Sequence, residues 1–216
     1  YAQMAGDVAV IYGGAGLGKS KAVAEYARSS LNVWHVTMTP ASASTVTALE
    51  EIGAVVGARE QGGAAKLHRA ICGKVRGTSG LLVIDEAQHL STAALDQIRS
   101  IHDATEIGIA LVGNTEVYAR MTGGNRAAYL DRLFSRIGKR LHLRSATDAD
   151  TTALIDAWGL TEGACRRRLL EIAKKPGALR VLTKVLRLAS MHAMAAQRAV
   201  CCEDVDRAWR ELGDAE

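Results

Sequence analysis

The 216-residue chain lacks the features that mark secreted and membrane proteins. It has only four cysteines, none of which forms a C-x-x-C pair, and we expect free thiols in a reducing compartment. It also has no apolar run as long as a membrane span, and no signal-peptide pattern of a basic segment followed by an apolar core. We therefore expect a cytoplasmic protein with no membrane partner.

Proline and phenylalanine are scarce as well. The chain has two prolines and one phenylalanine, and its six histidines show no metal-ligand spacing with one another or with the cysteines. Hydrophobic residues make up 48% of the chain and charged residues 23%, which allows one domain with a substantial core and a small appendage. Because the first residue is Tyr1 rather than Met, we expect a fragment or a processed chain.

One glycine-rich stretch matches the phosphate-binding pattern G-x-x-x-x-G-K-[ST] without a gap. Residues 9–12 precede it as an apolar strand, and residues 19–28 follow with helical spacing. Glycines let backbone N–H groups surround the β- and γ-phosphates, and the helix N-terminus adds its positive dipole end. Lys19 would bridge phosphate oxygens and Ser20 would bind Mg²⁺, so we expect ATP and Mg²⁺ as cofactors. The predicted nucleotide-binding residues are Gly13, Gly14, Ala15, Gly16, Leu17, Gly18, Lys19 and Ser20.

Two carboxylates follow another apolar run. Residues 81–84 read as a buried strand that leads directly into Asp85 and Glu86, at the sheet edge where open α/β folds bind ligands. Asp85 would hold the Mg²⁺ ion, and Glu86 would polarise the water that attacks the γ-phosphate. The alternative is an ordinary strand end that is acidic and solvated.

Strands and helices alternate through the first two thirds of the chain. Further strands are expected at residues 33–38, 107–112 and 139–143, with helices at 64–75 and 92–102 between them. Tyr26 and Val46 belong to the apolar positions of two earlier helices, and Ser42 or Ser44 can cap the second of these. This alternation predicts a three-layer α/β domain with a five-stranded parallel sheet.

Asn114 ends the fourth expected strand, next to the Asp-Glu strand. Its amide could orient the attacking water or contact the γ-phosphate, as a sensor of the nucleotide. An ordinary strand-to-helix cap is the alternative.

These motifs together resemble the AAA+ ATPases. The resemblance rests on the phosphate loop, the Asp-Glu strand, the strand that ends in Asn114, and a Ser-Arg segment at residues 133–137 before the last strand. In initiator and clamp-loader-like members such a segment carries an arginine finger that acts on a neighbouring subunit. The resemblance therefore implies ATP hydrolysis, an oligomer with ATP at the subunit boundary, and Arg136 as the finger, with Arg132 as second choice.

From residue 147 onward the chain reads as helices only. We place the α/β nucleotide-binding domain at residues 1–145 and a small, all-helical lid domain at 146–216. The resemblance extends to a Gly-x-x-Arg at the head of a lid helix, which implies that Arg180 contacts the γ-phosphate of its own subunit. The last helix is expected over residues 205–212, and Trp158 should belong to the apolar stripe of the first lid helix.

Positive charge is concentrated in this helical part. Between residues 163 and 202 the only acidic residue is Glu171. Such a run is either a solvated helix face or a surface for the phosphate backbone of DNA, bound with little sequence preference. No helix-turn-helix, zinc finger or aromatic platform accompanies it, so sequence-specific readout is not expected. The basic residues are Arg166, Arg167, Arg168, Lys174, Lys175, Arg180, Lys184, Arg187 and Arg198.

Within the AAA+ class, residues 33–52 resemble the phage Mu transposition protein B group. This implies ATP-dependent, sequence-nonspecific assembly on double-stranded DNA as a helical filament, in a bacterial or phage-infected cell, and contact with a transposase that is activated or directed by the filament. The resemblance also implies a DNA-binding region ahead of the ATPase domain, and we expect this region to precede Tyr1.

The same resemblance suggests where DNA would lie. Loops after the second strand and the helices that follow line the central channel of filament-forming members, and by position the candidates here are Thr39, Ser42, Ser44, Arg59 and Lys66. The hydroxyl groups would serve equally well as helix caps. Two other functions remain open: a helicase loader or replication-initiator-like ATPase, and a nucleotide-gated protein-binding switch that does not bind DNA.

Overall fold

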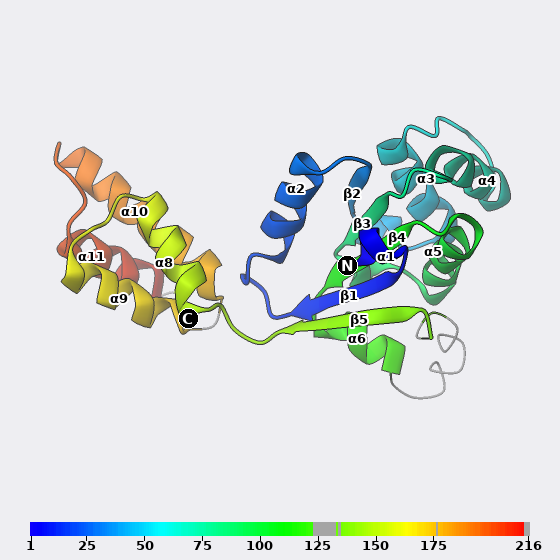
Figure 1. The fold of residues 1–216 in the computed structure, drawn as a ribbon. Coiled ribbons are helices and arrows are strands. Elements are labelled where there is room, and N and C mark those ends of the chain that lie inside the picture. The colour runs from blue at the N-terminus through cyan, green and yellow to red at the C-terminus, as the bar shows by residue number, and fades with distance from the viewer. Residues whose placement is uncertain (123–132, 134, 176, 214–216) are drawn as a thin grey trace. The chain divides into compact units, whose positions relative to one another are not determined.

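The computed structural model describes residues 1–122, 133, 135–175 and 177–213. It contains a five-stranded sheet with the strand order β2-β3-β4-β1-β5. The neighbours β1 and β4, β3 and β4, and β2 and β3 pair in parallel, and Figure 1 shows β5 running in the same direction beside β1. The expected five-stranded parallel sheet is confirmed. The strands are β1 (Val8–Gly13), β2 (Val33–Thr37), β3 (Leu81–Asp85), β4 (Gly108–Gly113) and β5 (Ile137–Leu143).

Helices cover both faces of this sheet, because its central strands are apolar on both sides. Leu82 and Ile84 of β3 belong to the larger core cluster, together with apolar residues of α3, α4 and α5. Leu81 and Val83 point to the opposite face, where they cluster with Ala2 and Val23 of the first two helices. The helices of this part are α1 (Ala2–Ala5), α2 (Lys19–Ser29), α3 (Thr45–Val56), α4 (Ala64–Val75), α5 (Thr92–Thr105) and α6 (Thr115–Thr122), with the short 3-10 helices η1 (Pro40–Ser42) and η2 (Ala87–His89).

The C-terminal helices form a core of their own. α10 packs against both α9 and α11, and Leu169, Leu182, Leu186 and Val205 are buried between these helices. Thr147 caps the first helix in a capping box with Asp150. The helices are α8 (Asp148–Ala157), α9 (Gly163–Ala173), α10 (Ala178–Ala195) and α11 (Cys202–Gly213).

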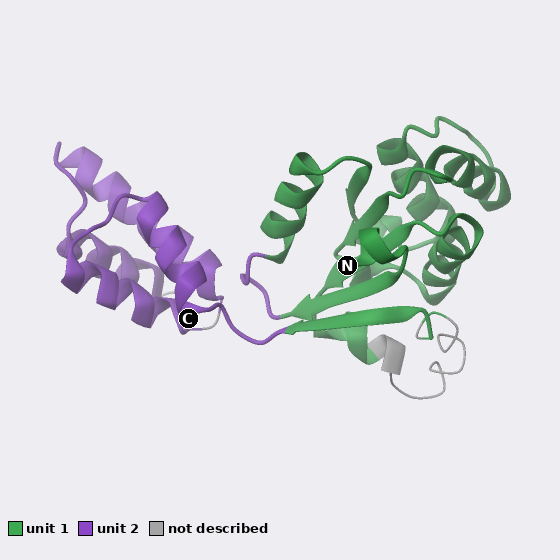
Figure 2. Ribbon diagram, viewed as in Figure 1, with its two compact units in different colours: residues 1–13, 19–142 green, residues 14–18, 143–216 purple. Residues whose placement is uncertain are grey.

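The chain divides into two compact units (Figure 2). The first unit consists of Tyr1–Gly13 and Lys19–His142, and the second of Gly14–Gly18 and Leu143–Glu216. The glycine-rich loop is thus grouped with the helical part rather than with the strand and the helix that flank it. No helix within the described ranges has both the length and the apolar character that a membrane span requires.

Four details differ from the sequence-based expectations. Tyr26 is 45% exposed and Val46 is 37% exposed, so neither belongs to the buried face of its helix. Trp158 is the C-cap of α8 and is 36% exposed. The last helix begins at Cys202 rather than at residue 205, because the Asp204 carboxylate accepts the backbone N–H of Cys201 and so satisfies the first turn.

All four cysteines carry free thiols. Cys165 of α9 is fully buried, and this burial raises the pKa of its thiol to about 11. A thiol with such a pKa stays protonated at neutral pH and behaves as a small apolar side chain.

We expect Asp204→Asn to destabilise the C-terminal unit by about 1.5 kcal/mol at neutral pH, because a buried, charge-assisted hydrogen bond is lost. Asp204 accepts hydrogen bonds from Arg198 (2.8 Å from Nη2) and from the Cys201 N–H (3.0 Å), and these hold the pKa of its carboxyl well below the usual range. The stabilisation is therefore complete above the unfolded pKa of about 3.9 and is lost as the pH falls toward the folded pKa.

Urea unfolding at several pH values, followed by tryptophan fluorescence in a Trp34→Phe background, measures this effect through Trp158 and Trp209. The difference between wild type and Asp204→Asn should shrink below about pH 4. The control is Asp206→Asn in the same helix, whose carboxylate is 46% exposed and binds Arg168. An Asp206→Asn effect as large as that of Asp204→Asn would contradict the prediction.

Candidate active site

The carboxyl ends of three neighbouring strands bring the predicted chemistry together. β1 ends at Gly13, β3 at Asp85 and β4 at Gly113, and these strands lie side by side in the order β3-β4-β1 (Figure 1). Their registers align the ends, since Tyr12 pairs with Gly113 and Ile84 with Leu111. The phosphate loop, the two carboxylates and Asn114 therefore emerge at one edge of the sheet.

Two glycines of the loop have a conformation that other residues rarely adopt. Gly16 has a φ of 80° and Gly18 a φ of 83°, both in the left-handed region. Within the second unit, the Gly16 backbone lies against the first turn of α10. A Cβ built on Gly16 would be 2.1 Å from the carbonyl oxygen of Gly177 and 3.1 Å from Cβ of Arg180. The predicted γ-phosphate ligand Arg180 thus lies beside the loop, and its role stays a prediction.

Lys19 and Ser20 occupy the first turn of α2. The ammonium group of Lys19 donates a hydrogen bond to the carbonyl oxygen of Gly13, with 2.9 Å between Nζ and O. This contact places a positive charge at the carboxyl end of β1, and a phosphate oxygen would bind it more strongly than the neutral carbonyl does. Ser20 is exposed one residue further along the helix.

Asp85 is almost completely buried at the end of β3, with 2% of its surface exposed. Its Oδ1 accepts the backbone N–H of Glu86 at 2.9 Å, whereas Oδ2 lies 3.9 Å from Nε2 of His35, beyond hydrogen-bonding distance. That His35 nitrogen is buried and has no hydrogen-bond partner among the described residues.

The donor set fits Mg²⁺. A buried carboxylate oxygen and a serine hydroxyl are hard ligands, and Mg²⁺ completes its shell with phosphate oxygens and water. Within the described ranges, no group of three or more His, Cys, Asp or Glu side chains could hold a metal ion by itself. Ser20 and Asp85 are the predicted protein ligands, and the nucleotide would supply phosphate oxygens.

Gln88 is a site residue that the sequence analysis missed. Its side-chain amide donates from Nε2 to Oε2 of Glu86, and its Oε1 accepts the backbone N–H of Asn114 at 3.3 Å. Gly113 permits this approach, since a Cβ there would be 2.4 Å from Oε1 of Gln88. Gln88 thus connects the predicted general base to the end of β4. The sequence shows that Gln88 lies two residues after Glu86. The direction of its side-chain amide is set by the left-handed conformation of Glu86 (φ 53°) and by the turn of η2, which no sequence motif indicates.

Asn114 uses its side chain to cap α6. Its Oδ1 accepts the backbone N–H of Glu116 at 2.9 Å, and its Nδ2 lies 3.4 Å from a carboxylate oxygen of the same residue. The structure thus shows the helix cap that the sequence left as an alternative, and the sensor role stays a prediction.

A stack of three rings stabilises the same edge. Tyr12, directly before the loop, lies between Tyr118 of α6 and His142 of β5, with ring centroids 4.5 Å and 4.6 Å apart and nearly parallel planes. The stack joins the ends of β1 and β5 to α6 and so helps to fix the start of the loop.

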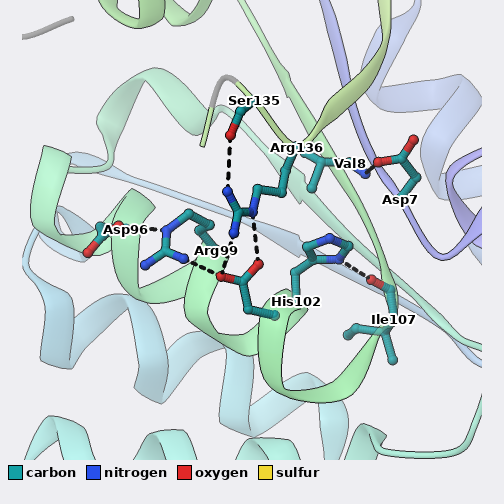
Figure 3. Close-up of polar contacts among 9 residues, drawn as sticks. Asp7, Val8, Asp96, Arg99, His102, Ile107, Ser135 and Arg136 are labelled. Atoms are coloured by element: carbon teal, nitrogen blue, oxygen red, sulfur yellow. Dashed lines mark hydrogen bonds and ion pairs between the residues drawn. The ribbon is translucent and has the colours of Figure 1, made fainter. Parts of the chain in front are cut away.

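Arg136 lies at the opposite edge of the sheet, before the start of β5. Its Nε donates to Oδ1 of Asp103 at 3.1 Å, and its Nη1 donates to the hydroxyl of Ser135 at 3.0 Å (Figure 3). Arg132, the second choice for the finger, is outside the described residues.

The candidate DNA-binding hydroxyls take part in helix capping. Thr39 and Ser42 form a capping box at η1, and Ser42 is only 3% exposed. Ser44 caps α3 and accepts the Thr47 N–H at 3.3 Å. Arg59 is exposed, whereas Lys66 forms an ion pair with Glu60 at 3.2 Å. DNA contact by any of these residues stays a prediction.

Among the nine basic residues between residues 163 and 202, three have acidic partners. Arg166 pairs with Asp156, Arg168 with Asp206, and Arg198 with Asp204. The other six are exposed and have no ion pair within the described part of the chain: Arg167, Lys174, Lys175, Arg180, Lys184 and Arg187. The last three lie on one side of α10, because their spacing of four and three residues brings them to the same helix face.

Two family models match the chain. The AAA domain matches residues 3–121, and the C-terminal domain of the Mu B transposition protein matches residues 135–212.

Three relatives cover most of the chain. The "ATP-dependent target DNA activator B" of Escherichia phage Mu is 41% identical over 98% of this chain and 68% of the relative. The protein of the same name from Escherichia phage D108 is 40% identical over the same shares. The Mu-like prophage FluMu DNA transposition protein B of Haemophilus influenzae is 40% identical over 85% of this chain and 65% of the relative. The chain thus spans about two thirds of the length of these relatives.

The fold also resembles that of a solved structure. The Aeropyrum pernix ORC1 protein, determined in complex with DNA, superposes with a TM-score of 0.69 at 17% identity, over 95% of this chain and 59% of that one. At this identity the similarity concerns the fold alone.

We expect Gln88→Ala to lower the kcat of ATP hydrolysis about tenfold and to leave KM nearly unchanged. The substitution removes the amide that orients Glu86 but no group that contacts bound phosphate. Steady-state ATPase assays measure the effect, and His89→Ala, a neighbouring half-buried residue, is the control. A rise in KM at constant kcat would mean that Gln88 contributes to binding instead.

Proposed function

The chain belongs to the phage Mu transposition protein B family and contains its AAA-type ATPase domain, and from this we propose that it binds double-stranded DNA in an ATP-dependent and sequence-nonspecific manner, assembles there, and activates or directs a transposase. The observation that carries the proposal is the nucleotide site at the carboxyl edge of the sheet, in a chain whose relatives are named ATP-dependent target DNA activators.

The geometry suggests a role for each residue at the nucleotide site. Backbone N–H groups of the glycine-rich loop would surround the phosphates, and Lys19 would exchange its Gly13 carbonyl partner for phosphate oxygens. Mg²⁺, held by Ser20 and Asp85, would neutralise charge on the β- and γ-phosphates. Glu86, oriented by Gln88, would polarise the attacking water. We further assign Asn114 to this water and Arg180 to the γ-phosphate of the same subunit.

Arg136 would act on the nucleotide of a neighbouring subunit. It lies at the amino edge of the sheet, where the start of β5 is next to Asp7. The phosphate loop begins at the carboxyl end of β1, and six strand residues span roughly 17–20 Å. A side chain on one edge cannot reach phosphates on the other edge of its own sheet. Use of Arg136 therefore requires self-association, with ATP at the boundary between subunits.

Charge supports DNA as the partner. The net charge is +4, and six of the nine cations between residues 163 and 202 are exposed without an acidic partner in the described structure. Exposed arginines and lysines can contact the phosphate backbone of DNA without reading its bases. Such contacts would make the affinity for DNA strongly dependent on the salt concentration. Arg59 and Lys66 offer a second basic site in the first unit.

We expect wild-type protein to be retained on random-sequence duplex DNA, and to form filaments there, only with a slowly hydrolysed ATP analogue. Lys19→Ala should lose both properties, because the loop no longer holds the nucleotide. The test uses the full-length protein, with pull-down and electron microscopy, and Lys21→Ala, an exposed lysine of the same helix, as control. Preference for single strands would favour a helicase loader. Nucleotide binding without any DNA binding at low salt would favour a protein-binding switch.

The two basic surfaces can be separated by charge reversal. If DNA lies along the first unit, Arg59→Glu/Lys66→Glu should weaken duplex binding at least tenfold and reduce its salt dependence. Lys74→Glu/Arg76→Glu has the same change of charge at the other end of α4 and should have little effect. Fluorescence anisotropy at several salt concentrations measures both. If Arg59→Glu/Lys66→Glu left the affinity for duplex DNA unchanged and Lys184→Glu/Arg187→Glu lowered it, the DNA contact would lie on α10 instead.

A further inference from the structure

Asp103 of α5 holds the side chain of Arg136. Its Oδ1 accepts a hydrogen bond from Nε of Arg136 at 3.1 Å, and its Oδ2 lies 3.5 Å from Nη2. Because Nε is the guanidinium nitrogen nearest the main chain, a bond to this atom restricts the direction in which the whole group points.

Asp103 is itself held by Arg99, one helical turn earlier. Nη1 of Arg99 donates to Oδ2 of Asp103, and Nε donates to Oδ1 of Asp96 at 2.8 Å (Figure 3). Only 14% of the Arg99 side chain is exposed, so it is the most buried residue of the series. Asp103 therefore binds Arg136 through Oδ1, and its Oδ2 accepts from Arg99 and also lies near Nη2 of Arg136.

The end of α5 is also fixed by contacts with the segment that leads into β4. The backbone N–H of Glu106 donates to the carbonyl oxygen of His102 at 2.8 Å and closes the helix. The ring nitrogen Nδ1 of His102 lies 2.9 Å from the carbonyl oxygen of Ile107 (Figure 3). The carboxylate of Asp103 thus has a defined position relative to the sheet.

Stability alone does not account for this arrangement. The side chains of Arg136 and Asp103 are 40% and 32% exposed, and ion pairs at that exposure add little to the free energy of folding. The contact does determine the orientation of the Arg136 side chain, which lies at the amino edge of the sheet. The proposed nucleotide site of the same subunit is at the opposite, carboxyl edge.

We propose that Asp103, held in turn by Arg99, is a positioning residue for Arg136 and directs its guanidinium toward the nucleotide of the neighbouring subunit. This inference rests on the proposed function, in which Arg136 acts in trans. Loss of Asp103 leaves the charge of Arg136 in place but lets the side chain sample other directions, and misplacement of a catalytic group by about 1 Å can cost on the order of a hundredfold in rate.

The test uses mixed oligomers of the full-length protein on duplex DNA with ATP. A donor subunit carries Glu86→Gln, which keeps the nucleotide-binding loop for assembly but removes the predicted general base, whereas an acceptor subunit carries Arg136→Ala and has no finger. Mixing the two should restore ATP hydrolysis above that of either alone. Asp103→Ala added to the donor should then reduce the restored kcat about ten- to a hundredfold, with little change in KM.

Adding Asp103→Ala to the donor or to the acceptor subunit distinguishes a positioning role of Asp103 from a general structural role. Asp103→Ala added to the acceptor should have no further effect, because that subunit's finger is already absent. Asp103→Glu in the donor should recover part of the rate, and Glu106→Gln in the donor removes a nearby charge as the control. Equal losses from both placements, or an increased rate, would overturn the role of Asp103. No restoration on mixing would overturn the trans action of Arg136, and this inference with it.

Discussion

Parallel strand pairing with both sheet faces covered is the constraint on which the rest of the structure depends. Because β3, β4 and β1 run in one direction in adjacent positions, the loop after Gly13, the carboxylates after Ile84 and the turn after Gly113 must share one edge. Burial of both faces makes β3 wholly apolar until Asp85, whose carboxylate is buried at the end of the strand. The chemistry of the site follows from this geometry.

The same sheet separates the two ends of the proposed reaction. The residues that we propose to hold and activate the nucleotide lie at the carboxyl edge, whereas Arg136, Asp103 and Arg99 gather at the amino edge. A strand of six residues lies between the edges, and no side chain spans that length. The proposed action of Arg136 therefore requires ATP at the boundary between two subunits, which would link hydrolysis to assembly.

The helical unit combines a compact core with a divided set of charges. Its buried leucines and valines hold α9, α10 and α11 together, and Asp204 and Asp206 at the start of α11 bind Arg198 and Arg168. The exposed cations of α10 have no ion pair within the described part of the chain and form one row along the helix. Composition alone does not distinguish basic residues that form ion pairs within the fold from basic residues that are exposed to solvent. The ion pairs seen in the structure do distinguish them.

Much of this protein was determined by local sequence alone. The glycine loop, the apolar strands and the helix caps at Ser44 and Thr147 depend on neighbouring residues, and the elements were found within a few residues of their predicted ends. Tertiary structure decided which apolar positions were buried, as Tyr26 and Val46 illustrate, because burial depends on what packs opposite. It also decided the partners of Gln88, Asp103 and Arg136. Gln88 follows a left-handed turn, Asp103 lies near the end of a helix, and Arg136 lies just before a strand. Their contacts join residues that are far apart in the chain, so the local sequence does not determine them.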